Sequence, residues 1–268
     1  MTRLQGLIAI SVSEPSEEEL GRLGLSKDHV RHAFIELCRQ VLARGASVGY
    51  GGDLRSGGYS QALLALLRTY SRPDRPAQSR IRQYLAWPVR AALTNEDAEA
   101  LAVFTTVVEV PPIDPPDARD SGSPARDYTA MREVMTSDLA TRVVVGGRTA
   151  GQTGRWPGVV EEAYLAVRAG CPLFVAGGLG GAAACVACAL SGDWPVELTT
   201  RFQSQHNRGY DALLAAGVGP DEEDLRRVLL GAEPRDGLGY EDRQALHGTT
   251  DLDHLVALIL RGLVRLKV

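Results

Sequence analysis

The feature that most restricts the fold of this 268-residue chain is a regular alternation of short apolar runs with longer amphipathic stretches. Six of the runs have the length and the β-branched content of buried strands. They are residues 6–13, 46–52, 80–88, 105–110, 142–147 and 171–176. The segments between them place apolar residues at helical spacing, as at 26–45 and 158–169. Strands that alternate with helices in this way form a parallel sheet, because each crossover connection is a helix.

We therefore predict an α/β fold: a doubly wound, mostly parallel, Rossmann-like sheet with helices on both faces. The whole chain, 1–268, is expected to form one domain, with a core over 6–190 and a helical C-terminal layer over 195–268, because the strand-like runs stop after Trp194. The proline-rich stretch 111–126 is the best candidate for a break. It suits a long surface excursion as well as a linker, and the same alternation resumes after it.

The composition excludes several classes of protein. Hydrophobic residues make up 44% of the chain and its formal net charge is −4. This charge argues against non-specific binding of nucleic acid. No apolar run approaches the roughly 20 residues that span a bilayer, so we expect a cytoplasmic protein without a membrane contact. Four cysteines are too few for a disulfide framework. Neither the Cys185–Cys188 pair nor the five histidines have the spacing of a metal site or a catalytic triad, so we predict no metal and no cofactor.

Glycine pairs follow three of the six predicted strands. In a doubly wound sheet, ligands bind beyond the carboxyl ends of the strands, so residues at these exits have the most functional weight. Glycine lets the backbone approach a phosphate or a sugar, and the free N–H groups of the next helix favour an anion. The alternative is that strand-to-helix turns use glycine only for its positive φ. The glycines are Gly51–Gly52, Gly146–Gly147 and Gly177–Gly178, with Gly180 close behind.

Three arginines stand in the same loops: Arg55 after the second strand, and Arg148 and Arg155 after the fifth. A guanidinium fork matches the geometry of phosphate, and three of them aimed at one crevice suit a diphosphate. The alternative is that they are solvated loop residues. The first strand is not followed by G-x-G-x-x-G, which disfavours an ordinary dinucleotide oxidoreductase.

Shorter polar residues complete the candidate site. Ser11 and Ser13 lie at the exit of the first strand, where they either meet phosphate or ribose or simply fill the loop. Asp53 either shapes the turn after the second strand or contacts the ligand. Glu161 and Glu162 open the predicted helix 158–169, where the helix dipole alone favours them by about 0.3–1 kcal/mol. Beside a bound nucleotide, we expect at least one of them to face ribose hydroxyls, as an acceptor in a sensor or as an acid/base in a hydrolase.

Taken together, these segments resemble the SLOG superfamily, which joins the Lonely Guy phosphoribohydrolases, the DprA/Smf DNA-processing domains and the N-terminal domains of TRPM channels. The resemblance covers residues 8–190 and is carried by YGGDLRSGGYS, by MREVM followed by SD, by VVVGG followed by PGVVEEA, and by PLFVAGGLGGAA. In Lonely Guy proteins, an arginine-bearing helix and a Pro-Gly-Gly-x-Gly-Thr-x-Glu-Glu loop bind a nucleoside monophosphate and cleave its N-glycosidic bond. The resemblance implies that Arg132 and Gly158–Glu162 take these positions, with Arg132 and Glu162 as the catalytic residues of a hydrolase.

The chain departs from that pattern at three points. Val159 replaces the threonine, Glu133 follows Arg132 where the family has a lysine, and the glycine loop is lengthened to GGRTAGQTGRWPG. Such lengthened versions are similar to prokaryotic SLOG domains found with TIR or SIR2 effectors in phage defence, and this resemblance implies sensing of an ADP-ribose-like or cyclic nucleotide. A nucleoside 5′-monophosphate hydrolase is the alternative, and a structural assembly module is the third possibility.

The closing segment 251–268 predicts assembly. Its apolar residues form one broad helical stripe, wider than a single sheet face usually covers. We expect part of it to contact a second copy in a homodimer or larger homo-oligomer, and the alternative is that it packs wholly onto its own sheet. The stripe consists of Leu252, Leu255, Val256, Ile259, Leu260, Leu263, Val264 and Leu266.

Overall fold

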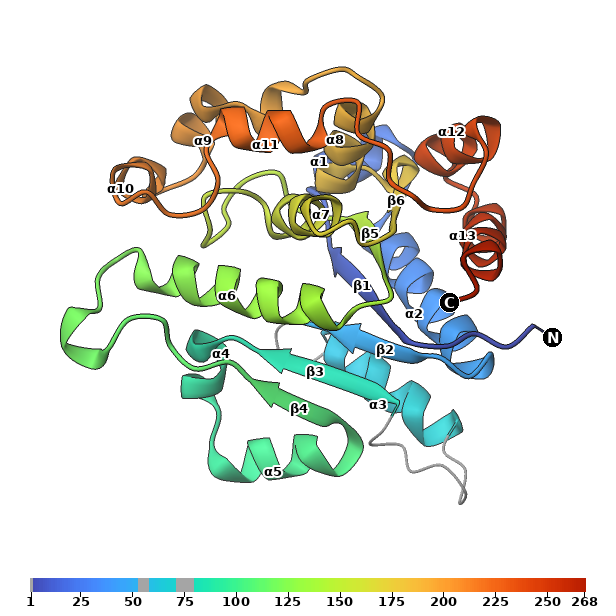
Figure 1. Cartoon of the computed structure of the whole chain (residues 1–268), viewed down its shortest axis with the longest axis horizontal. Helices are drawn as coiled ribbons and strands as arrows, with labels where there is room; N and C mark the ends of the chain where they lie inside the picture. Colours follow the sequence, from blue (N-terminus) through green and yellow to red (C-terminus); the bar gives the residue numbers. More distant parts are fainter. Residues whose placement is uncertain (1, 53–57, 71–79) are drawn as a thin grey trace.

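The computed structural model describes residues 2–52, 58–70 and 80–268. Six strands form one sheet in the order β4-β3-β2-β1-β5-β6, and each neighbouring pair is parallel (Figure 1). The strands are β1 (Leu7–Ser13), β2 (Ser47–Tyr50), β3 (Ile81–Leu85), β4 (Thr106–Glu109), β5 (Thr141–Gly146) and β6 (Leu173–Ala176). The prediction of a doubly wound parallel α/β sheet is confirmed.

Helices cover both faces of this sheet (Figure 1). The helices up to β6 and directly after it are α1 (Glu17–Arg22), α2 (Lys27–Ala43), α3 (Tyr59–Tyr70), α4 (Trp87–Ala92), α5 (Asn95–Phe104), α6 (Ser123–Asp138), α7 (Gly158–Arg168) and α8 (Gly181–Leu190). The C-terminal helices are α9 (Thr200–His206), α10 (Tyr210–Ala215), α11 (Glu222–Leu229), α12 (Tyr240–Gly248) and α13 (Leu252–Leu266). None of the helices within the described residues is both long and apolar enough to cross a membrane.

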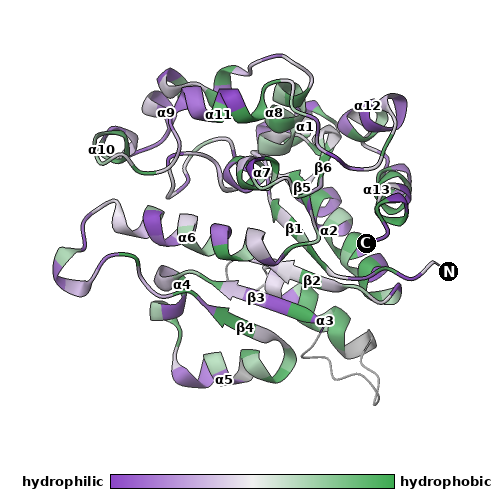
Figure 2. Ribbon diagram, in the orientation of Figure 1, coloured by the Kyte–Doolittle hydropathy of each residue, from purple (hydrophilic) through white to green (hydrophobic). Residues whose placement is uncertain are grey.

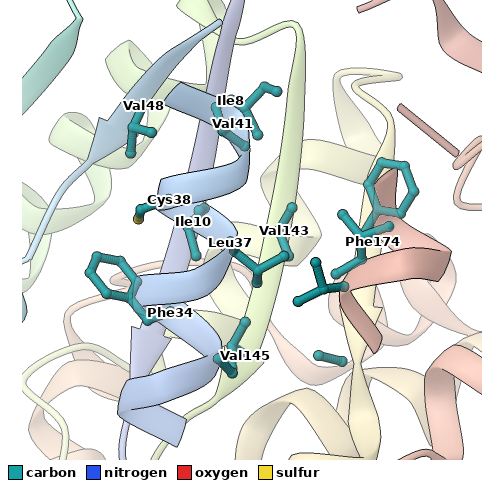
Figure 3. Close-up of a cluster of buried hydrophobic side chains, with 14 of the residues drawn as sticks. Ile8, Ile10, Phe34, Leu37, Cys38, Val41, Val48, Val143, Val145 and Phe174 are labelled. Carbon is teal, nitrogen blue, oxygen red and sulfur yellow. The ribbon is translucent and has the colours of Figure 1, made fainter. Parts of the chain in front are cut away.

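The central strands are buried on both faces, as expected for a parallel sheet. Figure 2 shows them as hydrophobic ribbon. Along β5, Val143 and Val145 point into the cluster around α2, whereas Val144 points into the cluster around α7 and α8. In Figure 3, Phe34 and Leu37 of α2 lie with these valines in the first cluster. Alternate side chains of β5 therefore contribute to two separate hydrophobic cores, one on each face of the sheet.

One added helix and one corrected boundary distinguish the structure from the sequence pattern. The acidic stretch after the first strand contains α1, because Ser16 caps the helix by accepting a hydrogen bond from the Glu19 N–H at 3.2 Å. The strand expected over 80–88 ends at Leu85, because Pro88 stands in the first turn of α4, where its missing N–H is not needed.

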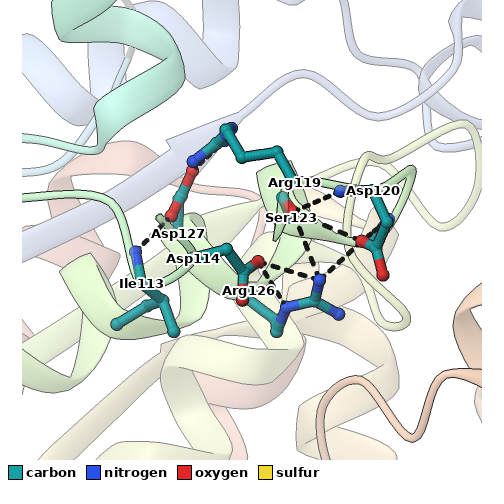
Figure 4. A network of polar contacts seen from close by, with 8 residues as sticks. Ile113, Asp114, Arg119, Asp120, Ser123, Arg126 and Asp127 are labelled. Atoms are coloured by element: carbon teal, nitrogen blue, oxygen red, sulfur yellow. Dashed lines mark hydrogen bonds and ion pairs between the residues drawn. The ribbon is translucent and has the colours of Figure 1, made fainter. Parts of the chain in front are cut away.

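The proline-rich stretch before α6 is an ordered excursion held by charged side chains (Figure 4). The Asp127 carboxylate accepts hydrogen bonds from the Ile113 N–H at 2.9 Å and the Arg119 guanidinium at 2.6 Å, and its side chain is fully buried. Arg126 binds two further carboxylates. α6 begins within this network, at Ser123. The network comprises Ile113, Asp114, Arg119, Asp120, Ser123, Arg126 and Asp127.

The C-terminal stripe lies against the chain's own core. α13 packs beside α2, and its Leu255, Ile259 and Leu263 are fully buried. Val264 remains 38% exposed. The stripe therefore covers the same core as α2 and gives no support of its own to a contact between copies, so the homo-oligomer remains a prediction.

Candidate functional site

A pocket of about 400 Å³ opens at the carboxyl ends of β1, β2 and the loop after β5. This edge is where the strand order turns from β2 on one side of β1 to β5 on the other, the usual ligand position in doubly wound sheets. α3 and α7 both begin at the pocket, so their unpaired N–H groups favour an anion there. The pocket is lined by Val12, Ser13, Glu14, Tyr50, Gly51, Gly52, Gly58, Tyr59, Val89, Tyr128, Arg132, Arg148, Gly158, Val159 and Glu162.

Arg132 of α6 forms the pocket wall next to α7. Its Nη1 donates to the buried Glu161 carboxylate, and its Nε lies 3.5 Å from Glu162 Oε1. Burial acts to lower the pKa of Arg132, but the attraction of the two glutamates outweighs it and raises the pKa. Thr129 also donates to Glu161, so Glu161 is satisfied within the protein. Nη2 of Arg132 makes no hydrogen bond to the residues that the structure describes and is therefore available to a ligand.

Glu162 is held in place by hydrogen bonds from two side chains of the sheet. Ser11 of β1 and Arg142 of β5 project from the same sheet face, and both donate to Glu162 Oε2. Arg142 also donates to Ser11 Oγ at 2.8 Å and to Thr136 Oγ1 at 3.0 Å. The Arg142 side chain is fully buried, and this burial lowers its pKa despite the attraction of Glu162. Two arginines and two glutamates thus form a charge-balanced, buried base for the pocket.

A glycine makes room for this charged cluster at the start of α7. A Cβ atom at Gly158 would lie 2.8 Å from Arg132 Nη2. The start of α7 can therefore approach the guanidinium only because residue 158 has no side chain.

The outer wall of the pocket is partly aromatic and has one unpaired cation. Tyr50, Tyr59 and Tyr128 line it, and Tyr128 lies 5.6 Å from the Arg132 guanidinium. Burial raises the pKa of Tyr59, with a further contribution from Glu14, so its hydroxyl stays protonated. At the rim, the Arg148 N–H donates to Ser13 Oγ at 3.3 Å. The exposed Arg148 guanidinium makes no hydrogen bond or ion pair with any described residue.

With this geometry, the comparisons with known proteins are informative about the family. A family model described as SLOG cluster2 matches residues 3–230. The chain belongs to the SLOG cluster2 family. The SLOG resemblance expected from the sequence is confirmed, whereas a search of curated protein sequences gives no match.

Two solved structures resemble this SLOG cluster2 chain at low identity. TM1055, a structural genomics target, is 14% identical with a TM-score of 0.42, over 80% of this chain and 99% of its own. DNA processing protein A from Helicobacter pylori, described for its single-stranded DNA binding mode, is 14% identical with a TM-score of 0.37, over 85% of this chain and 79% of its own.

Most of the predicted site residues of this SLOG chain lie together. Those that line the pocket are Ser13, Gly51, Gly52, Arg132, Arg148, Gly158 and Glu162. Ser11 and Glu161 lie in the charged cluster behind it. Gly146 and Gly147 form the turn after β5 with positive φ, and the Gly147 N–H donates to the Ser13 carbonyl at 2.7 Å. Asp53 and Arg55 fall outside the described residues.

The remaining candidates lie away from the pocket. A Cβ atom at Gly177 would lie 2.5 Å from the His247 carbonyl oxygen, and one at Gly178 would lie 2.1 Å from that of Thr249. These glycines therefore allow the end of α12 to pack on the exit of β6. Gly180 precedes α8, whose first N–H, that of Gly181, donates to the Glu19 carboxylate at 2.6 Å. The anion position at α8 is thus filled by the protein's own side chain.

Arg155 lies away from the pocket in the long loop after β5. It is buried beside Trp156, and its Nε has no hydrogen-bond partner among the described residues. The Trp156 indole N–H donates to the Pro220 carbonyl at 2.8 Å. The fully buried Gln203 of α9 donates to the Thr149 and Glu197 carbonyls, both at 2.8 Å. The lengthened loop is therefore fixed by α9 and the segment before α11.

Arg142 is the charged site residue that the sequence analysis missed, and the lining residues Tyr50, Tyr59 and Tyr128 were not predicted either. Its signal was a cation inside an otherwise apolar strand, because a buried parallel strand carries charge only where a partner compensates it. The Cys185–Cys188 pair shows no catalytic environment, since burial raises the pKa of both thiols. Within residues 2–52, 58–70 and 80–268, no three His, Cys, Asp or Glu side chains gather as a metal site.

Proposed function

We propose that the pocket binds a nucleotide-derived small molecule, of the ADP-ribose-like or cyclic nucleotide type, and that the protein acts as a sensor of it. The observation that carries this proposal is that two cationic groups line one pocket and that two helices begin at the same pocket. Arg132 Nη2 and the Arg148 guanidinium both border the pocket where α7 begins. These groups suit phosphate, and the tyrosines beside them suit a base.

The state of Glu162 favours a sensor over an enzyme. Its Oε2 already accepts hydrogen bonds from Ser11 and Arg142, and Oε1 faces Arg132. A carboxylate held in this way is a fixed acceptor for ribose hydroxyls. Because Oε2 already accepts two hydrogen bonds, a role as general acid or base would have to use the same Oε1, which faces the Arg132 cation.

Calorimetry tests the sensor directly. We expect folded wild-type protein to bind ADP-ribose or one of its cyclic isomers, and Arg148→Met to weaken that binding about tenfold, since a charge-assisted contact is lost. Arg208→Met, an exposed arginine outside the pocket lining, is the matched control and should bind as the wild type does. Absence of binding to every nucleotide tried, by protein with an intact unfolding transition, would contradict the proposal.

A hydrolase of nucleoside 5′-monophosphates is the second candidate. One observation favours it: Arg132 Nε lies 3.5 Å from Glu162 Oε1, and both residues line the pocket, as the Lonely Guy resemblance implies. Chromatography after incubation with AMP would reveal free adenine, and Glu162→Gln should abolish its release. If AMP stays intact at high protein concentration, the hydrolase is excluded and the sensor remains the proposed function.

The wider setting also remains a prediction. We propose a cytoplasmic protein of prokaryotic stress response or phage defence, coupled to a TIR or SIR2-type effector and assembled as a homo-oligomer. Light scattering tests the last point, because a monomer at tens of micromolar would contradict it.

A further inference from the structure

Two further hollows continue the candidate pocket along the surface. The middle hollow, about 300 Å³, shares Glu14 and Arg148 with the pocket. The outer hollow, about 610 Å³, shares Ser16, Thr149 and Ala150 with the middle one. The three hollows are therefore contiguous, and we call them together the long groove.

Arg148 stands where the pocket meets the middle hollow. The other cation of the middle hollow, Lys27, already forms an ion pair with Glu17 at 2.6 Å. Arg148 is thus the cation of this hollow whose guanidinium has no protein partner among the described residues. A linking phosphate group would satisfy it without breaking an existing pair.

The outer hollow has a different chemistry. The Phe202 and His206 rings are stacked there, with centroids 4.1 Å apart and planes at 19°. Such a pair is a platform on which a flat ring can stack. Three carboxylates, Glu18, Glu19 and Glu197, border the hollow together with one arginine, Arg22, which lies 3.9 Å from Glu18. Ionised carboxylates can only accept hydrogen bonds and outnumber the arginine, so a ring with amino or amide donors or a positive charge is favoured over a phosphate.

We propose that the ligand has two heads: a nucleotide in the candidate pocket and a second, nitrogen-bearing ring in the outer hollow, joined by a diphosphate at Arg148. This inference rests on the proposed function and specifies its ligand class as a dinucleotide joined through phosphates. A mononucleotide would occupy only the first third of the long groove and would leave the stacked rings of α9 without a role in binding.

Calorimetry with two matched probes tests the second head. AMP carries one head, and NAD carries two heads joined by a diphosphate. We expect wild-type protein to bind NAD at least tenfold more tightly than AMP. His206→Ala, which removes an exposed ring, should weaken NAD binding at least fivefold and leave AMP binding unchanged. Gln205→Ala, its exposed neighbour outside the lining of the outer hollow, is the control and should change neither.

The outcomes separate the two proposals. Equal affinities for AMP and NAD would overturn the second head and leave nucleotide binding intact. Equal weakening of both probes by His206→Ala would also overturn it, because the effect would then reach the first pocket. No binding of either probe by folded protein would overturn the proposed function together with this inference.

Discussion

The loops after β5 and β6 begin alike and end differently. Both strands run into a glycine pair, Gly146–Gly147 or Gly177–Gly178, and a helix begins beyond each loop. After β5 the glycine pair itself packs against protein, since a Cβ at Gly146 would lie 2.8 Å from the Ser13 carbonyl oxygen and one at Gly147 would lie 2.9 Å from Ala182. The open pocket lies further along this loop, where Arg132 lines the wall beside the start of α7. After β6 the Thr249 carbonyl and the Glu19 carboxylate occupy the corresponding space at α8. The glycine pairs at both exits therefore mark close approach of the protein itself, and the two exits differ in whether the space at the start of the next helix is left open or is filled.

The largest effect is expected from removing Arg142, the buried cation beneath the open pocket. Arg142→Met would leave Glu162 without its fully buried partner, so we expect the free energy of unfolding to fall by about 3–5 kcal/mol. Urea denaturation measures the loss. Arg148→Met at the rim is the control, and its cost should stay below about 0.5 kcal/mol because its guanidinium is exposed. The double variant Arg142→Met with Glu162→Met should recover part of the loss, and its failure to do so would contradict a paired charge cluster.

A pair of glycine substitutions contrasts the two exits directly. In Gly178→Ala, the new Cβ would meet the Thr249 carbonyl at 2.1 Å, so we expect a loss of roughly 2–3 kcal/mol in stability with ligand affinity unchanged. In Gly158→Ala, the new Cβ would lie 2.8 Å from the terminal Nη2 of Arg132, a side-chain atom that can shift more readily than a backbone carbonyl, so we expect a smaller stability loss together with weaker ligand binding. Unfolding curves and calorimetry on both variants decide the matter, and the reverse pattern would refute the comparison.

The anchoring of the long loop gives a third, smaller effect. Gln203→Met keeps the volume but removes the two hydrogen bonds donated to the Thr149 and Glu197 carbonyls and the one accepted from Gln152, which should cost about 1–2 kcal/mol. Because Thr149 follows Arg148, ligand affinity should also fall severalfold. Gln205→Met on the exposed side of α9 is the matched control. Wild-type affinity in Gln203→Met would show that the loop needs no support from α9.

The sequence predicted the sheet well because apolar periodicity is a local property. Runs such as 142–147 are buried on both faces and are therefore apolar apart from Arg142, and the glycines that end them are visible in the same window. The pocket lining could also be anticipated in part, since Ser13, Gly158 and Glu162 all lie at strand exits or helix starts.

What the sequence could not supply is the identity of the group that fills each space. Nothing in the residues around Gly178 indicates that Thr249, some 70 residues later, approaches it. Likewise, Arg155 is indistinguishable from Arg148 as a loop arginine, yet one packs beside Trp156 and the other faces the pocket. Such contacts depend on how α9 to α13 fold back onto the core, which no short window of residues encodes.

The packed exit of β6 should also respond to pH in a way that the pocket does not. His247 belongs to α12, the helix whose end covers Gly177, and its Nδ1 is buried without a partner among the described residues. Burial lowers the pKa of His247, Arg243 lowers it further, and Asp236 partly opposes them. The folded protein therefore keeps the imidazole neutral at a pH where the unfolded chain, with a pKa of about 6.5, already binds a proton.

This difference makes the unfolding free energy depend on His247 with a definite sign. Its contribution is complete above about pH 6.5 and is lost as the pH falls toward the lowered pKa of the folded state, by at most about 1.4 kcal/mol per pH unit for one proton. His247→Gln should flatten the profile of unfolding free energy against pH in this window, whereas His254→Gln, which alters an exposed histidine of α13, should leave it as in the wild type. Urea denaturation at several pH values on the three proteins provides the comparison. Identical pH profiles of the wild type and His247→Gln would show that water reaches His247 under α12. The exits of β5 and β6 would then differ less than their contacts indicate.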